Sequence, residues 1–405
     1  MRAPVRVTFA DSDGVAFSTP LHKRAASAGN ASLAQVPTPM ALDARLRLAL
    51  AGLAPATPFV SGSSPKPGNL SFPLKPTSAS LSSANAPAPP PPPPPPIVVV
   101  GSANADIYVE VDRLPLVGET VAARAGRSLA GGKGANQAAC GGRLATGATY
   151  LVARVGDDAN GRLLEDALAD AGGVRLDRVA RAPDAPSGHA VVMLMPDGQN
   201  SIIIVGGANM EGWDAGIGPE DLDLIRQAGV LLLQREIPDW VNVQVAQAAK
   251  DAGVPVILDA GGMDAPVPGE LLSLVDIFSP NETELARLTG MHTETFEQIS
   301  QAAGACHKMG VKEVLVKLGS QGSALFIEGE KPIRQPIIPA AEVVDTTGAG
   351  DTFTSAFAVA LVEGKPKKEC MRFAAAAASL CVQRPFIPNN GCAGTPNSTD
   401  PMKFP

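Results

Sequence analysis

The sequence is poor in the residue types that build disulfide scaffolds and metal clusters. Its 405 residues include five cysteines and four histidines, and no two cysteines have the C-x-x-C spacing. An odd number of cysteines without this spacing argues against a disulfide framework and against a zinc ribbon. The apolar runs are all much shorter than the roughly 20 residues of a membrane-spanning helix, so we expect no membrane partner.

The charge is distributed unevenly along the chain. Residues 1–96 contain eight basic residues, three acidic residues and no glutamate, which is a net charge of +5. Because the whole chain carries −7, the remainder carries −12. A body this acidic is unsuited to nucleic-acid binding, and we expect its ligands to be small molecules.

Residues 1–96 have the composition of a targeting segment rather than of a folded domain. Serine, alanine, proline and threonine dominate, acids are scarce, and the segment ends in eight prolines, Pro89–Pro96. This composition is typical of organelle transit peptides, and its serine and proline content favours a plastid over a mitochondrion. The stretch Pro39–Pro55 could form a short amphipathic helix, and the prolines would form an extended spacer. The alternative is a linker or a misassigned start codon in a cytoplasmic protein.

From Ile97 onward, apolar strands alternate with helical patterns. The run Ile97–Val111 opens with four apolar residues, which is typical of a strand buried on both faces of a parallel sheet. The alternation predicts a doubly wound α/β domain. Two regions, 107–127 and 187–208, have strand character without helices between and should form a small separate β-layer, with a hairpin turn at Asp197–Gly198. The other expected strands are 149–156, 229–234, 254–260, 275–281 and 313–319, and the expected helices are 133–147, 161–171, 219–228, 238–252, 282–289, 296–309, 351–364 and 372–383.

The most informative motif is VDTTGAGDTF, Val344–Phe353, which leads into an apolar helix. Gly348, Ala349 and Gly350 let the backbone approach a ligand closely, and the helix directs free N–H groups to the same place. Asp351 adds a carboxylate that can take the proton of an attacking hydroxyl. The combination predicts phosphoryl transfer. The alternative is that Asp351 only caps the helix.

A second glycine-rich motif is AGGKGANQAA, Ala130–Ala139. Lys133 and Asn136 could hydrogen-bond sugar hydroxyls while the glycines bring the backbone close. The motif lacks the Walker A spacing, and no G-x-G-x-x-G follows the first strand, which argues against a dinucleotide-dependent oxidoreductase. A simple glycine-rich turn before a helix is the alternative.

Further polar residues follow other predicted strands. Asn104 and Asp106 stand two residues apart, so they share one side of a strand and would make a polyol clamp. The segment PNETE, 280–284, places Asn281 and Glu284 at the start of a helix, where a carboxylate can organise Mg²⁺ through water. The turn Lys317–Gly322 suits nucleotide phosphates. Taken singly, the first two motifs are also compatible with a structural role.

In this order, the motifs resemble those of the ribokinase/PfkB carbohydrate kinase family. The resemblance runs from about Ile97 to about Val382, and we expect residues 97–383 to form the kinase domain. The pairing of N-A-D with GGKGANQ is similar to members that act on D-ribose. The resemblance implies ATP- and Mg²⁺-dependent phosphorylation of D-ribose at its 5-hydroxyl. It also implies a Rossmann-like domain with a small β-sheet lid that often serves as a homodimer interface. The alternatives are another sugar or nucleoside kinase, such as a fructokinase, and a weakly active regulatory or scaffold protein.

The resemblance also implies roles for individual residues. Asp351 would be the catalytic base, with Gly348, Ala349 and Gly350 as the anion hole. The implied ribose ligands are Asn104, Ala105, Asp106, Gly132, Lys133, Gly134, Ala135, Asn136, Asp351 and, on the second lid strand, Gln199. The implied ATP ligands are Asn281, Lys317, Leu318, Gly319, Ser320, Gln321, Gly322, Gly350 and Asp351. Glu284 would contact Mg²⁺ through water, and Asp345 and Thr347 would belong to a K⁺ site.

The resemblance ends after Gln383. Family members continue with a segment close to K-G-A-x-P-S-x-P, which completes the K⁺ site and packs beside the adenine. This chain continues as RPFIPNN, and its further prolines disfavour a helix. We interpret 384–405 as a divergent, irregular tail that arose by alternative splicing or a frame error. We therefore expect K⁺ activation to be impaired.

Overall fold

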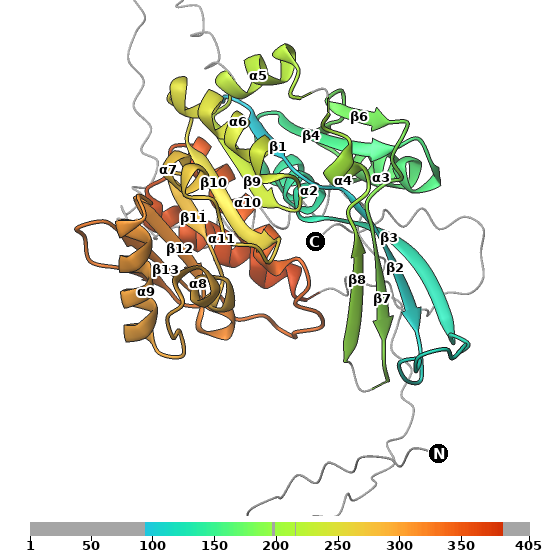
Figure 1. The fold of residues 1–405 in the computed structure, drawn as a ribbon. Helices are drawn as coiled ribbons and strands as arrows, with labels where there is room; N and C mark the ends of the chain where they lie inside the picture. Colours follow the sequence, from blue (N-terminus) through green and yellow to red (C-terminus); the bar gives the residue numbers. More distant parts are fainter. Residues whose placement is uncertain (1–93, 197–198, 215, 384–405) are drawn as a thin grey trace, which may run out of the picture. The chain divides into compact units, whose positions relative to one another are not determined.

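The computed structural model describes residues 94–196, 199–214 and 216–383 (Figure 1). The interpreted targeting segment up to residue 93, the turn at Asp197–Gly198 and the tail after Gln383 lie outside the described residues. Three prolines, Pro94–Pro96, directly precede the first strand. The carbonyl oxygen of Pro96 accepts a hydrogen bond of 2.8 Å from the amide of Gly229, so these prolines already belong to the folded domain.

A ten-stranded sheet forms the centre of the domain, with the strand order β14-β13-β12-β11-β10-β9-β1-β4-β5 and β6 paired to β4. The pairs from β12 to β5 and β6 are parallel, and β13 and β14 add an antiparallel edge. The strands are β1 (Ile97–Val100), β4 (Thr149–Gly156), β5 (Val174–Arg175), β6 (Val179–Ala182), β9 (Val230–Arg235), β10 (Val256–Gly262), β11 (Ile277–Ser279), β12 (Glu313–Lys317), β13 (Ser323–Ile327) and β14 (Ile333–Gln335).

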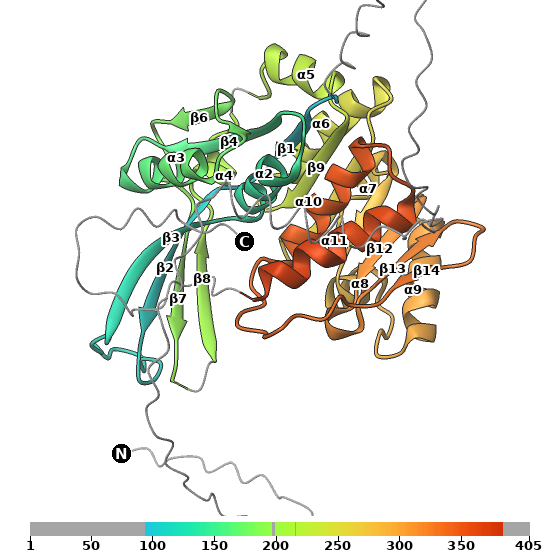
Figure 2. The same cartoon turned by 180° about the vertical axis from the view of Figure 1, so that it is seen from behind.

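Helices cover both faces of this sheet (Figures 1 and 2), which confirms the doubly wound α/β prediction. Alternate residues of β1 enter different cores: Val98 and Val100 join one, Ile97 and Val99 the other. The first core is closed by α5 (Pro219–Arg226), α6 (Asp239–Asp251), α7 (Gly269–Leu274), α8 (Glu282–Thr289) and α9 (Phe296–Lys308). The second is closed by α2 (Lys133–Leu144), α3 (Ala159–Ala171), α10 (Ala349–Val362) and α11 (Lys367–Cys381).

A second sheet of four strands has the order β3-β2-β7-β8 and confirms the expected small β-layer. Its central pair is parallel and its outer pairs are antiparallel. Both views show it extending away from the central sheet (Figures 1 and 2). The strands are β2 (Asn104–Glu110), β3 (Ala125–Gly131), β7 (His189–Leu194) and β8 (Asn200–Val205).

The run Ile97–Val111 is divided between the two sheets, and the small β-layer begins at Asn104 rather than at the expected residue 107. The chain leaves the central sheet at Gly101, where a Cβ would lie 2.0 Å from the Oε1 atom of Gln234. A side chain at this position would have to displace the Gln234 amide, and the backbone turns there into β2. Among the described helices, none is long and apolar enough to cross a lipid bilayer.

Candidate active site

The start of helix α10 is a ready anion-binding site. Gly348 precedes the helix with φ of 73° and ψ of −3°, a left-handed conformation that glycine adopts without strain. The amide of Ala349 donates to the carbonyl oxygen of Thr346 at 3.2 Å. The amides of Gly350 and Asp351 follow at the helix start, where N–H groups have no acceptor within the helix and attract anions.

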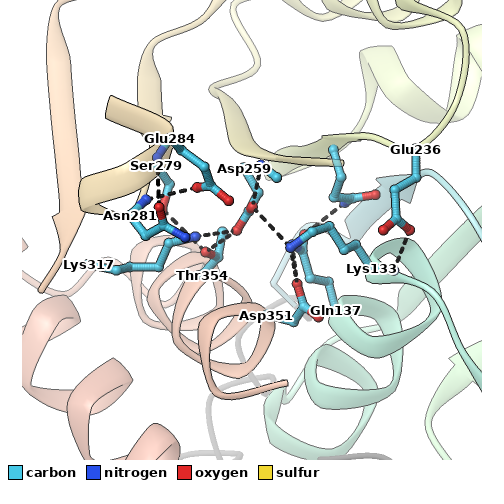
Figure 3. Close-up of polar contacts among 12 residues, drawn as sticks. Lys133, Gln137, Glu236, Asp259, Ser279, Asn281, Glu284, Lys317, Asp351 and Thr354 are labelled. Atoms are coloured by element: carbon cyan, nitrogen blue, oxygen red, sulfur yellow. Dashed lines mark hydrogen bonds and ion pairs between the residues drawn. The ribbon is translucent and has the colours of Figure 1, made fainter. Parts of the chain in front are cut away.

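Asp351 lies in the first turn of α10 and faces helix α2 rather than its own helix. Its side chain is buried, and its Oδ2 accepts a hydrogen bond of 2.9 Å from Nδ2 of Asn136. Its Oδ1 lies 3.4 Å from Nε2 of Gln137 and 3.6 Å from Nζ of Lys133 (Figure 3). The helix cap is Gly348, so the alternative reading of Asp351 as a cap does not describe its contacts.

The GGKGAN glycines serve close packing of the backbone. Gly132 has φ of 90°, and a Cβ there would lie 2.7 Å from the amide nitrogen of Asn104. A Cβ on Gly134 would lie 2.6 Å from the amide nitrogen of Ser102. Helix α2 therefore begins directly against the link between β1 and β2. This contact places Lys133 beside the first residues of β2.

Asn104 and Asp106 do lie on one strand, at the start of β2. Nδ2 of Asn209 donates to Oδ1 of Asn104 at 2.7 Å, and Nδ2 of Asn104 lies 3.5 Å from Oε2 of Glu236. Burial, followed by repulsion from Glu236, raises the pKa of Asp106 to about 7. The amides and carboxylates at the start of β2 can therefore both donate to and accept from a polyol.

Glu236 is a site residue that the sequence analysis missed. Its Oε2 accepts hydrogen bonds from the Ser102 hydroxyl at 2.5 Å and from the Lys133 amide at 3.0 Å. Glu236 directly follows β9. The rule that ligands bind beyond the carboxyl ends of parallel strands could have identified it, as it did Asn104.

Asp259 on β10 was also missed, although it lies at the centre of the polar cluster in Figure 3. Its Oδ2 accepts hydrogen bonds from Nζ of Lys317 at 2.6 Å and from the Thr354 hydroxyl at 3.0 Å. Its Oδ1 lies 3.7 Å from Nζ of Lys133. Burial disfavours the charged carboxylate, but the two lysines outweigh this and hold the pKa of Asp259 well below its usual range. Likewise, burial disfavours the ammonium of Lys133, but attraction by Asp351 and Asp259 raises its pKa.

The expected ATP residues are brought together at the ends of β11 and β12. Asn281 forms an isolated parallel bridge with Lys317, and the amide of Leu318 donates to the carbonyl oxygen of Gly322 at 2.8 Å. Gly319–Gln321 form a short 3-10 helix between them. Asn281 and Glu284 also form a capping box at the start of α8, in which each side chain accepts from the other's amide at 2.8 Å.

Gln199 is not brought to this cluster within its own chain, contrary to our expectation. It is exposed and directly precedes β8. Asn200 pairs with Leu194, and Leu194 pairs with Glu110. Glu110 is the last residue of β2, six positions after Asn104. The long strands of the small sheet therefore carry Gln199 away from the start of β2.

Asp345 and Thr347 lie in the loop before α10. The Thr347 amide donates to Oδ1 of Asp345 at 2.8 Å, and the Asp345 amide donates to the carbonyl oxygen of Val382 at 3.2 Å. The loop is thus tied to the end of α11. The divergent residues 384–405, which replace the segment that completes the K⁺ site in the family, lie outside the described residues.

The fold and the site together define a small-molecule kinase of the doubly wound α/β class. The profile of the pfkB family of carbohydrate kinases matches residues 95–386. A protein named ribokinase from Arabidopsis thaliana is 70% identical over 285 residues, which cover 70% of this chain and 75% of that protein. Ribokinase from Bacillus subtilis is 36% identical over 283 residues, 70% of this chain and 91% of that protein.

A solved structure extends the similarity to three dimensions. The structure of Arabidopsis thaliana ribokinase complexed with ribose and ATP matches with a TM-score of 0.70 and 70% identity, covering 72% of this chain and 93% of that one. This chain belongs to the pfkB family of carbohydrate kinases.

Proposed function

We propose that this protein is a ribokinase, which transfers the γ-phosphoryl group of ATP to the 5-hydroxyl of D-ribose and releases D-ribose 5-phosphate and ADP. The observation that carries the proposal is the buried carboxylate of Asp351 at the anion-binding start of α10. The Arabidopsis relative solved with ribose and ATP supports this choice of substrates.

Asp351 accepts the proton of the 5-hydroxyl as the sugar oxygen attacks the γ-phosphorus and the bond to the ADP oxygen breaks. Asn136 and Gln137 donate to the carboxylate from α2 and fix its direction. Gly348 and Ala349 shape the start of helix α10. There the amides of Gly350 and Asp351 stabilise the charge on the transferred phosphoryl group. Each of these groups is fixed by packed helices before the substrates arrive.

The sugar site consists of the polar groups between β2 and α2. Asn104, Asp106 and Glu236 provide amide and carboxylate groups. From α2, Lys133 provides its ammonium as a donor and Asn136 provides Oδ1, which has no hydrogen-bond partner in the described residues, as an acceptor. Ala105, Gly132, Gly134 and Ala135 shape the backbone around them. Gln199 is left out of this proposed site for the reason given above.

The nucleotide side comprises Asn281 and the turn Lys317–Gly322. Glu284 uses Oε2 in the capping box, while its Oε1 lies 3.0 Å from the position of a Cβ on Gly261, on the side of Lys133. One carboxylate oxygen therefore fits a water-mediated contact to Mg²⁺, which takes few protein ligands when it accompanies phosphates. When bound, Mg²⁺ would neutralise phosphate charge.

Among the described residues, no three or more His, Cys, Asp or Glu side chains are grouped to hold a metal by themselves. For K⁺, we propose that Asp345 and Thr347 form half of a site. A large monovalent ion needs several oxygens, so half a site should bind it weakly. We expect low turnover that changes little when KCl replaces choline chloride, measured as initial rates. Strong activation by K⁺ would show that the divergent tail completes the site.

We further propose that the protein is a homodimer through the four-stranded sheet and is targeted to a plastid. Exposed isoleucines on β8 support the first proposal. The serine- and proline-rich residues ahead of the family match support the second. A reporter fused after residue 96 tests the targeting: plastid import is expected, and a mitochondrial or cytoplasmic reporter would contradict it.

A coupled assay of ATP consumption with D-ribose, D-fructose and adenosine tests the activity. Turnover with ribose is expected, with the phosphate on C5 located by phosphorus–proton correlation spectroscopy. Preference for fructose or adenosine would identify a different kinase of the same family. No turnover with any of them would favour the regulatory or scaffold alternative.

A further inference from the structure

Four charged side chains form an alternating row across the site (Figure 3). The row runs from Lys317 to Asp259, then to Lys133, then to Asp351. The successive nitrogen–oxygen distances are 2.6, 3.7 and 3.6 Å. It therefore extends from the nucleotide turn to the proton acceptor, with Asp259 as the one carboxylate between two ammonium groups.

Asp259 is built into the protein rather than presented to a ligand. Its side chain has no exposed surface, and its Oδ1 also accepts from the Gly261 amide at 3.1 Å. The Thr354 hydroxyl donates to its other oxygen. A buried carboxylate is costly unless it is paired and hydrogen-bonded, and here lysines and donors satisfy both oxygens.

The two lysines contact different oxygens of the Asp259 carboxylate, Lys317 at Oδ2 and Lys133 at Oδ1. Nζ of Lys133 lies beside Asp351, and Nζ of Lys317 lies 3.8 Å from the position of a Cβ on Gly350, at the start of α10. Space for Lys133 depends on a glycine, because a Cβ on Gly261 would lie 2.4 Å from its Nζ. The placement of both ammonium groups is thus specified by their surroundings.

We propose that Asp259 is a positioning residue that holds the ammonium groups of Lys133 and Lys317 on either side of the transferred phosphoryl group. The inference rests on the proposed kinase function. Lys317 adds a fixed positive charge beside the amides that face the developing phosphoryl charge. When Asp351 takes the sugar proton, its charge is neutralised and Lys133 loses that partner. Asp259 remains charged and keeps Lys133 in place through the step.

The test compares three variants with a matched control. Asp259→Asn keeps the size of the side chain and removes its charge, Lys317→Met removes one ammonium, and Gly261→Ala displaces Lys133. The control is Glu313→Gln, which removes the partner of Lys367 at 2.8 Å, on the same strand as Lys317 but at its other end. We expect Asp259→Asn to lower kcat by about tenfold to a hundredfold, with the KM of ribose and of ATP within about threefold.

Lys317→Met and Gly261→Ala should also lower kcat by about tenfold, and the control should leave it unchanged. Loss confined to KM, or kcat within about threefold of the parent in Asp259→Asn, would overturn the proposal. If Asp259→Asn does not fold, the other two variants decide by the same criterion.

A readout that needs no turnover separates this inference from the proposed function. Nitrogen NMR of the lysine side chains should show ammonium resonances of Lys133 and Lys317 that exchange slowly in the parent and are lost in Asp259→Asn. Lost resonances together with a parent that phosphorylates no sugar would reject the kinase function but keep the role of Asp259 in lysine placement. Unchanged resonances in Asp259→Asn would reject the inference itself.

Discussion

The two sheets of this protein contribute to the site in different ways. Every residue of β1 and β9 is buried, and two large cores flank them. The small sheet has a core of only three buried residues, Tyr108, Ala190 and Val192, and its Ile202 and Ile204 are 53% and 66% exposed. The proposed proton acceptor, Asp351, and the start of α10 therefore belong to the central domain. Asn104 and Asp106 belong to a sheet with a small core and exposed apolar side chains.

The junction between the sheets is firmly held. Asn209, in the short helix α4 (Ala208–Glu211), is buried, and its side chain exchanges two hydrogen bonds of 3.0 Å with the backbone of Ala103. The same amide donates to Asn104, and the indole of Trp213 donates to the Asn209 carbonyl oxygen at 2.7 Å. The base of β2 is thus fixed to the domain, and any freedom of the small sheet lies farther along its strands.

The largest expected effect comes from a change in the central domain, at Asp351. Asp351→Asn keeps the shape of the side chain and its contact with Asn136 but removes the proton acceptor. We expect kcat to fall by about a hundredfold or more, with the melting temperature close to that of the parent. Steady-state kinetics on purified protein checks this. Near-parental kcat would show that another group takes the proton.

The small sheet should instead affect binding. On β8, Ile204 and Ile202 are the cross-strand partners of Ala190 and Val192 on β7. These two are in turn the partners of Asp106 and Tyr108 on β2. All six side chains therefore lie on the same face of the small sheet. If a second copy covers this face, the double change Ile202→Ser and Ile204→Ser should give a monomer. We expect the KM of ribose to rise about tenfold while kcat is kept.

Sedimentation equilibrium and ribose titration of kcat/KM check this second prediction. Trp240→Ser is the control, since Trp240 is 49% exposed on α6. A parent that is monomeric, or a double variant that remains dimeric, would contradict the assigned interface.

The elements of the central sheet were predictable because their signals are local. Strand β4 and helix α8 have the predicted bounds: β4 is a nearly continuous buried run, and α8 is started by the Asn281–Glu284 capping box. The start of the small β-layer was not predicted: β2 begins at Asn104, ahead of the expected residue 107. Only three residues separate β1 from β2, and one of the two partners of β2, strand β7, lies much later in the chain.

The same contrast holds within the site. Asp351, Lys133 and Asn136 were identified because they stand in dense motifs. Asp259 and Glu236 were missed because what distinguishes them is a partner far away in sequence: Lys317 is 58 residues from Asp259, and Lys133 is 103 residues from Glu236. The place of Gln199 could not be read from its neighbours in sequence, because the length of a strand decides which end of a sheet a residue reaches.

The pH dependence of stability offers a test, of smaller effect, at Asp106, near the boundary between the two sheets. Burial and Glu236 raise the pKa of Asp106 from 3.8 to about 7. A carboxyl whose pKa is raised on folding contributes stability that is complete below the unfolded value and is lost as the pH rises through the folded value. The melting temperature of the ligand-free parent should therefore fall between pH 3.8 and about 7 relative to Asp106→Asn. Calorimetry across this range checks it, and parallel profiles for the two proteins would contradict the raised pKa.

The smallest effect is expected where the chain enters the central sheet. Residues 1–93 lack the hydrophobic pattern of a core, so a chain that begins at Pro94 should keep the melting temperature and kcat of the full chain. A chain that begins at Ile97 loses the hydrogen bond from Gly229 to Pro96 and the packing of Pro94 and Pro95 against Gly147 and Gly229. That bond is worth about 1 kcal/mol, which corresponds to a few degrees in melting temperature. Calorimetry of the three chains resolves the difference. Equal melting temperatures of the two shortened chains would place the edge of the domain at Ile97. A lower melting temperature already in the chain from Pro94 would show that earlier residues stabilise the domain.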